Sequence, residues 1–204
     1  MADTSFAVNA GSGTNLHTVT TSIGGTTVHD QVVKHGEPYL AAYGIASVSA
    51  ISLATVNDHI LQIMAGSTLN VYVRRIRVYQ VVAATTAGFS QIVLYRLSTA
   101  GTGGTSITPS LFDTTDSAAG CTAMSLPTAK GTETVVLGRA AKILEQTAPT
   151  SGVDVLVAEW NFDHLRTKGI RIPAGTANGI AIKSVVAAAG ASVQVEAVVS
   201  EANF

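Results

Sequence analysis

From residue 39 onward, apolar and polar residues alternate with a period of two, which is the pattern of half-buried β-strands. Near the C-terminus, Val193 and Val195 share one face of the chain while Gln194 and Glu196 share the other. The only helical candidate, residues 138–146, is short and lacks a defined apolar face. The pattern predicts about nine strands, at residues 41–53, 59–65, 69–83, 89–98, 132–137, 143–147, 153–162, 179–186 and 191–200.

The segments between these strands decide the class of β fold. They contain glycine- and threonine-rich turns, with turn residues such as Pro173 to Gly175 before one strand, and no helices alternate with the strands. Such an arrangement favours an antiparallel sandwich or barrel over a parallel βαβ sheet. We therefore predict an all-β fold, an antiparallel jelly-roll-like β-sandwich over residues 39–204.

The alternation slips inside the longest predicted strand. Val73 occupies an odd position of the apolar face, whereas Ile76 occupies an even one. A β-bulge at Arg74 and Arg75 would return the strand to a single buried face, and it would direct Arg74, Arg75 and Arg77 toward one region.

Two interpretations of this arginine cluster remain open. The arginines could solvate one face of the sheet and pair with carboxylates such as Glu159 or Glu196. Alternatively, they could form a salt-bridge cluster between subunits. In both cases we count them as candidate interface residues.

Residues 1–38 differ in composition from the rest of the chain. They are rich in Gly, Ser, Thr and Asn, show no helical period and end at Pro38, which disfavours helix at the preceding residue. We predict an extended N-terminal arm. Because such a segment buries too little surface to offset the entropy of ordering it, its scattered apolar side chains need a partner surface. These candidate interface residues are Phe6, Val8, Leu16, Val19, Ile23, Val28 and Val32.

The composition also points to contact with other proteins. Only 12% of the residues are charged while 47% are apolar, and Thr, Ser, Ala and Gly stand where a soluble monomer would carry Lys and Glu. The net charge of −1 gives no electrostatic basis for binding nucleic acid, and no apolar run approaches the roughly 18 residues that a membrane span requires. The composition therefore favours a protein that forms one part of a larger assembly.

No motif for catalysis, a metal or a cofactor emerges from the sequence. The glycine-rich stretch from Gly101 to Thr105 lacks the lysine of a phosphate-binding loop, and the five histidines are too dispersed to form a local ligand motif. Cys121 is the only cysteine, so no disulfide can form within the chain. We expect a non-enzymatic protein without cofactor or metal.

Aromatic residues, 5% of the chain, offer few places for a ligand to stack. Trp160 and Phe162 point to the same face if residues 153–162 form a regular strand. We favour a role for them as core or interface side chains. The alternative is a shelf for a glycan, built from Trp160 or from a tyrosine-bearing loop such as Tyr39 to Tyr43.

Several segments resemble virion proteins of tailed bacteriophages. They are residues 59–64, 71–78, 92–97, 105–116 and 169–175. Within that group the chain is most similar to jelly-roll capsid decoration, or cement, proteins. The resemblance implies a homotrimer on the outer capsid surface, at or near three-fold positions, that clamps neighbouring major capsid proteins. It implies no catalytic residues.

The leading hypothesis is thus a structural protein of the capsid exterior. Its partners would be other copies of itself and the major capsid protein, with no nucleic acid and no membrane. The N-terminus has an acid where a secretory signal has basic residues, which predicts synthesis in the host cytoplasm. The alternatives are a tail, neck or head-fibre component, and a carbohydrate-binding β-sandwich module.

Overall fold

A computed structural model describes residues 18–23, 26–31, 40–86, 88–146, 155–162 and 169–202. The chain divides into two compact units, residues 1–38 and residues 39–204. The division coincides with the change from a Gly/Ser/Thr/Asn-rich composition to the period-two alternation. The two units are described separately below.

The first unit contains a pair of antiparallel strands. β1 (Thr18–Ile23) pairs with β2 (Thr26–Gln31) from Thr18 opposite Gln31 to Ile23 opposite Thr26. The sequence analysis predicts an extended arm and identifies no strands within it, so this hairpin is an addition to the prediction. Threonine and valine favour extended backbone, but the segment has too few alternating apolar residues for a strand pair to be recognised.

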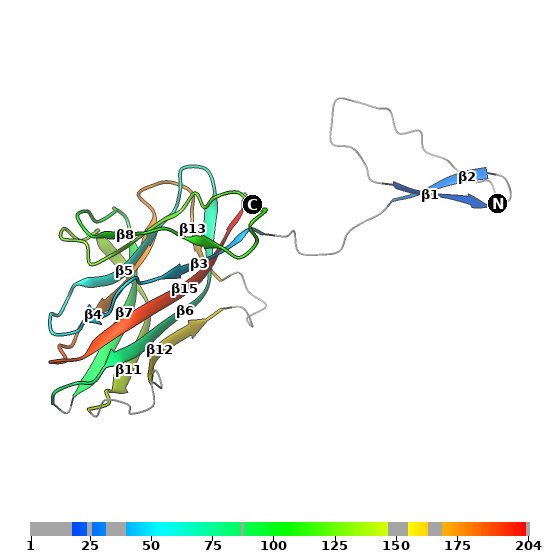
Figure 1. The fold of residues 1–204 in the computed structure, drawn as a ribbon. Helices are drawn as coiled ribbons and strands as arrows, with labels where there is room; N and C mark the ends of the chain where they lie inside the picture. The colour runs from blue at the N-terminus through cyan, green and yellow to red at the C-terminus, as the bar shows by residue number, and fades with distance from the viewer. Residues whose placement is uncertain are drawn as a thin grey trace. The chain divides into compact units, whose positions relative to one another are not determined.

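The second unit is a β-sandwich of two antiparallel sheets (Figure 1). Among the described residues it contains no helix, and hence none able to cross a membrane. One sheet has the order β12-β6-β15-β3-β9, and the other has the order β11-β7-β14-β5-β10-β8. We refer to them as the β6 sheet and the β7 sheet. Their strands are β3 (Ala42–Ala46), β5 (His59–Met64), β6 (Asn70–Val82), β7 (Phe89–Leu97), β8 (Thr105–Ile107), β9 (Ser110–Leu111), β10 (Thr122–Ser125), β11 (Glu133–Ile143), β12 (Val155–Asn161), β14 (Gly179–Ser184) and β15 (Ser192–Ala202). Two further strands lie beside these orders: β4 (Ile51–Ser52) pairs with β15, and β13 (Ile170–Ile172) pairs with β6.

The chain passes repeatedly from one sheet to the other. β5 lies in the β7 sheet and β6 in the β6 sheet; β11, β12, β14 and β15 then continue to alternate in the same way. The last strand, β15, is inserted between β6 and β3. Neighbours within each sheet are therefore mostly distant in sequence.

A large apolar core lies between the sheets, and a separate small cluster is formed by Met64, Leu97 and Ala181. On β15, Val193, Val195 and Val199 are fully buried in the large core, while Glu196 on the opposite face is exposed. The apolar members of the predicted alternation thus form the inner face, because that face is removed from water. The predicted β-sandwich is confirmed.

The predicted bulge at the arginines is also confirmed. The consecutive residues Val198 and Val199 of β15 pair with Arg75 and Val73 of β6, so Arg74 is the extra residue. The insertion places Val73 and Ile76 on the same buried face although two residues separate them.

Strand β11 differs from the prediction. The sequence analysis predicts separate strands at 132–137 and 143–147, whereas the structure has one strand from Glu133 to Ile143, and Thr147 lies outside the described residues. The strand passes through Gly138 with register shifts on both sides of Val136. Small residues and two shifts obscure the alternation, which explains why the pattern breaks there.

We expect Ile76→Ala to lower the free energy of unfolding by about 2–5 kcal/mol. Ile76 is fully buried, and it lies between Trp160 of β12 and Ala197 of β15 in the sheet register. Urea denaturation followed by circular dichroism would measure the change. The control is Val48→Ala, at a side chain that is 78% exposed, with an expected change within about 0.5 kcal/mol. Equal effects of the two substitutions would contradict this assignment of the core.

Candidate interaction surface

The three predicted arginines lie on β6 and none of them enters the core. Arg74 and Arg75 lie between the inward-facing Val73 and Ile76, and all three arginines are partly exposed. In the register Arg77 lies between Glu159 of β12 and Glu196 of β15. The structure therefore brings this part of the predicted interface together on the β6 sheet.

These arginines differ in their contacts. Arg77 forms an ion pair through Nε with Oε1 of Glu159 at 2.8 Å and donates to the hydroxyl of Tyr79. Arg74 donates from Nε to Oγ of Ser200 at 3.0 Å. Arg75 makes no hydrogen bond or ion pair with the residues that the structure describes, and it has a guanidinium free to meet a partner.

Most of the arm residues predicted to make contacts cannot be placed. Phe6, Val8, Leu16 and Val32 lie outside the described residues. Val19, Ile23 and Val28 belong to the hairpin of the first unit, where Val19 pairs with Asp30 and Val28 with Thr21. Their role in an interface stays a prediction.

A groove with a volume of about 620 Å³ opens beside β3. We call it the β3 groove. Its walls come from the end of β3 and the residues just after it, from the stretch between Ser106 and Phe112 that contains the end of β8 and part of β9, and from the adjacent parts of β15 and β6. They include Ala46, Val48, Arg75, Ile107, Phe112 and Glu196.

Two large apolar side chains at this groove face solvent. Val48 is 78% exposed and Phe112 is 64% exposed. The Phe112 ring lies over Gly44, where an added Cβ would come within 3.4 Å of the ring. The sequence analysis did not single out these residues, because the groove joins segments that are about 60 positions apart along the chain.

Further exposed apolar side chains lie near the two ends of the edge strand β11. Ile143, 76% exposed, is paired across the sheet with the exposed Phe89 of β7. Val135 and Val136 on the same strand are also exposed. Exposed β-branched and aromatic side chains along an edge strand are typical of contact with another protein.

Neither of the described candidates for the glycan shelf, Trp160 and Tyr43, forms an exposed aromatic platform. Trp160 packs against the core, and a Cβ added at Gly138 would lie 2.6 Å from its indole Nε1. Tyr43 is buried and donates its hydroxyl to the carbonyl of Ser117 at 3.0 Å, while Tyr39 lies outside the described residues. Trp160 and Phe162 both pack against the core, as favoured from the sequence.

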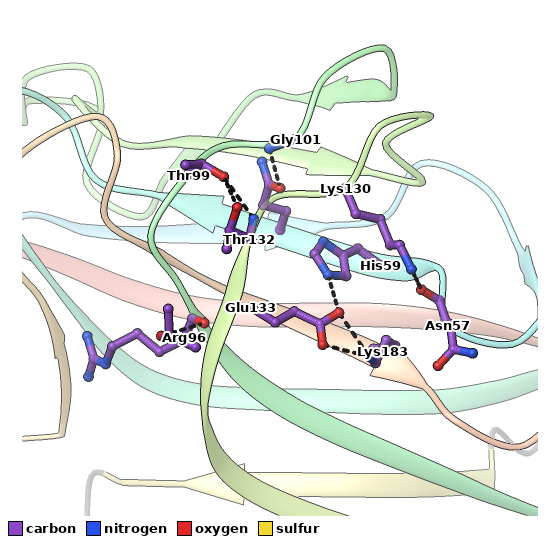
Figure 2. A network of polar contacts seen from close by, with 11 residues as sticks. Asn57, His59, Arg96, Thr99, Gly101, Lys130, Thr132, Glu133 and Lys183 are labelled. Carbon is purple, nitrogen blue, oxygen red and sulfur yellow. Dashed lines mark hydrogen bonds and ion pairs between the residues drawn. The ribbon is translucent and has the colours of Figure 1, made fainter.

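A polar network links β5, β11 and β14 (Figure 2). Glu133 Oε1 lies 3.0 Å from Nε2 of His59, and Glu133 Oε2 lies 2.6 Å from Nζ of Lys183. The Lys183 ammonium also lies 4.4 Å from the centre of the Tyr95 ring, a cation–π contact. The network was not predicted, because only the strand order brings positions 59, 133 and 183 together.

Burial controls the ionisation of this network. Burial lowers the pKa of His59 more than the hydrogen bond with Glu133 raises it. A neutral His59 donates from Nε2 to Glu133, which leaves Nδ1 buried and without a partner among the described residues. Partial burial would raise the pKa of Glu133, but hydrogen bonds from Lys183 and His59 hold it below its ordinary value. The network is thus a neutral imidazole beside a Lys–Glu ion pair.

Another buried carboxylate holds the segment before β10. Glu201, at the end of β15, accepts hydrogen bonds from the N–H groups of Gly120 and Cys121 at 2.9 and 2.6 Å. This contact joins the last strand of the β6 sheet to the segment that leads into the β7 sheet. Within the part of the chain that is described, no three His, Cys, Asp or Glu side chains are grouped so that they could hold a metal ion.

Comparison with known proteins gives no match: no family model, curated protein or solved structure is significantly similar to this chain. The functional argument therefore rests on the residues described above.

The His59 network predicts acid sensitivity. Because the pKa of His59 is lowered in the folded state, the unfolded chain binds more protons below the ordinary value of 6.5. The free energy of unfolding should therefore fall as the pH is lowered through 6.5, and fall again below 4.5 as Glu133 loses its contribution. Urea denaturation over this pH range would measure both steps. In His59→Gln, which retains a donor but does not titrate there, the first step should shrink; an unchanged step would refute the assignment to His59.

Cys121 should be unreactive in the folded protein. Burial, together with the nearby charge of Glu201, raises the pKa of its thiol to about 12, so almost no thiolate is present at neutral pH. We expect a colorimetric disulfide reagent to modify the thiol only after denaturation in urea. Rapid, stoichiometric modification of the native protein would contradict this expectation.

Proposed function

We propose that this protein is a non-enzymatic structural protein of a bacteriophage virion, which decorates and stabilises the capsid by binding over major capsid protein subunits. The observation that carries the proposal is the presence of large exposed apolar side chains on β7 and β11, at Phe89, Val135, Val136 and Ile143, in a chain with few charges. Large exposed apolar side chains of this kind are typical of a surface that a neighbouring subunit covers.

We further propose that the sandwich is a jelly roll. The orders β12-β6-β15-β3 and β11-β7-β14-β5 can be drawn as two interleaved four-stranded Greek keys. The short strands β9, β10 and β8 then extend the two sheets at one side. Jelly rolls are common among viral capsid domains, and they also occur in lectins. The inward-packed Trp160 favours the capsid role over the lectin role.

The buried polar groups support a structural role as well. His59 is fully buried and Lys183 nearly so, and both interact with Glu133. Glu201 is likewise occupied by two main-chain N–H groups. Each of these contacts joins separate segments of the fold, which is the role of a structural network.

Attachment would combine the sandwich with the arm. In a homotrimer, three arms would bind one capsid site cooperatively, because the first contact raises the effective concentration of the others. Strong attachment then requires only modest binding by each arm. A test of attachment must therefore compare the full chain with a chain that lacks the arm.

The direct test is electron microscopy of particles from producing cells, labelled with gold-conjugated antibodies against residues 39–204. We expect many copies of the label over the head. Label confined to the tail or neck would favour a component of those structures, and unlabelled particles would overturn the virion proposal.

The arm is tested by deleting residues 1–38, which leaves a unit with its own core. Light scattering should give a mass three times the chain mass of 20.9 kDa for the full chain, and a trimer again for the truncated form. The truncated trimer should fail to bind particles that the full chain decorates. Its full retention on particles would argue against attachment through the arm.

A further inference from the structure

We propose that the β3 groove binds an extended polypeptide strand of a partner protein, which pairs with the free edge of β3 at Ala46. The proposal does not depend on the virion role, since it concerns the kind of segment that the groove accepts. It is carried by three observations: an unpaired main-chain edge, two exposed apolar side chains beside it, and an arginine without a partner.

The edge of β3 is paired over only part of its length. β9 pairs with Tyr43 and Gly44, and then the chain leaves toward the other sheet. Beyond this point the N–H of Ser47 turns to β15, where it donates to the carbonyl of Val195 at 2.9 Å. Because main-chain groups of successive residues point to opposite edges of a strand, those of Ala46 point away from β15 and into the groove.

Ala46 has no hydrogen-bond partner on that side among the described residues. Its side chain is exposed and it lines the groove. A main-chain N–H and C=O on one residue are satisfied together by a paired residue of another strand. An extended peptide is therefore the ligand that this edge accepts.

The walls of the groove suit the side chains of such a strand. Val48 and Phe112 offer exposed apolar surface on either side of Ala46. Strand β3 ends at Ala46 and residues 48–49 form a bend, so Val48 lies just beyond the free edge and Phe112 lies beside the paired Gly44. Apolar side chains on that strand would cover Val48 and Phe112.

Charge complementarity defines the strand further. Arg75 lines the groove and is without a partner among the described residues. Glu196 lines it too, and lies directly opposite Ala46 in the register with β15. An acidic side chain on the partner strand would thus be placed toward Arg75 and away from Glu196.

The long edge strand β11 is less suited to strand addition than Ala46 of β3. Strand β11 is interrupted by two register shifts and carries the exposed cations Arg139 and Lys142. Bulges and cations are devices that prevent strand addition. Between Gly44 and Val48 there is no proline, charged residue or register shift.

The test uses the full chain as bait for a displayed library of random twelve-residue peptides. Selected peptides should alternate β-branched residues with others and carry an acidic residue. Their binding is then compared between two variants. Ala46→Pro removes the free N–H but no bond to β15, and the matched control Ala46→Val keeps the N–H. We expect at least a tenfold loss of affinity in Ala46→Pro and little loss in Ala46→Val.

Two further measurements test the proposal even if Ala46→Pro fails to fold. In the native protein, a bound peptide should slow hydrogen exchange of the Ala46 amide, as measured by NMR. In Arg75→Glu, selection should replace acidic peptides by basic ones. No enriched peptide, equal binding by Ala46→Pro, or an unprotected Ala46 amide would each overturn the proposal.

Discussion

The pairing of β6 with β15 is the interaction on which the rest of the body depends. The two strands pair along their length, from Ser192 opposite Val82 to Ala202 opposite Asn70. β12 and β13 attach to β6, while β3 and β4 attach to β15, so each strand of that sheet except β9 pairs directly with one of these two. Their inner faces supply fully buried valines to the core, and Glu201 extends the influence of β15 to the segment before β10. The bulge at Arg74 is accommodated within this pair, and it determines which arginines meet solvent.

Much of this architecture could be read from the sequence, because burial of one sheet face leaves a period of two. The break in that period at Arg74 was sufficient to locate the bulge. The same signal fails where side chains are small: β11 passes through Gly138 and two alanines, so its continuity could not be seen. β8, β9 and β10 are too short for an alternation to be recognised in the sequence, and the order of strands depends on contacts between distant segments. The jelly-roll topology remains our interpretation of that order.

The candidate surfaces were less accessible from the sequence. The arginine cluster lies within one strand, so its spacing was visible, and pairing with Glu159 was one of the two interpretations considered. The β3 groove and the His59–Glu133–Lys183 network have no local signature, since their members are brought together only by the folded sheets. Both features nevertheless reflect the same physical requirement: main-chain and polar groups must be satisfied within the fold or left exposed to solvent. The network satisfies most of them, whereas the groove leaves an edge open.

The position of β15 has a consequence for how the protein is made. This strand is the last of those described along the chain, yet it occupies the interior of its sheet between β6 and β3. During synthesis, β3 and β6 leave the ribosome well before the strand that must separate them. The β6 sheet therefore cannot be completed until β15 has emerged, and until then β3 and β6 have unpaired edges. For a protein with few charges, that interval is the period of greatest exposure to aggregation, and rapid completion of the final strand protects the whole body.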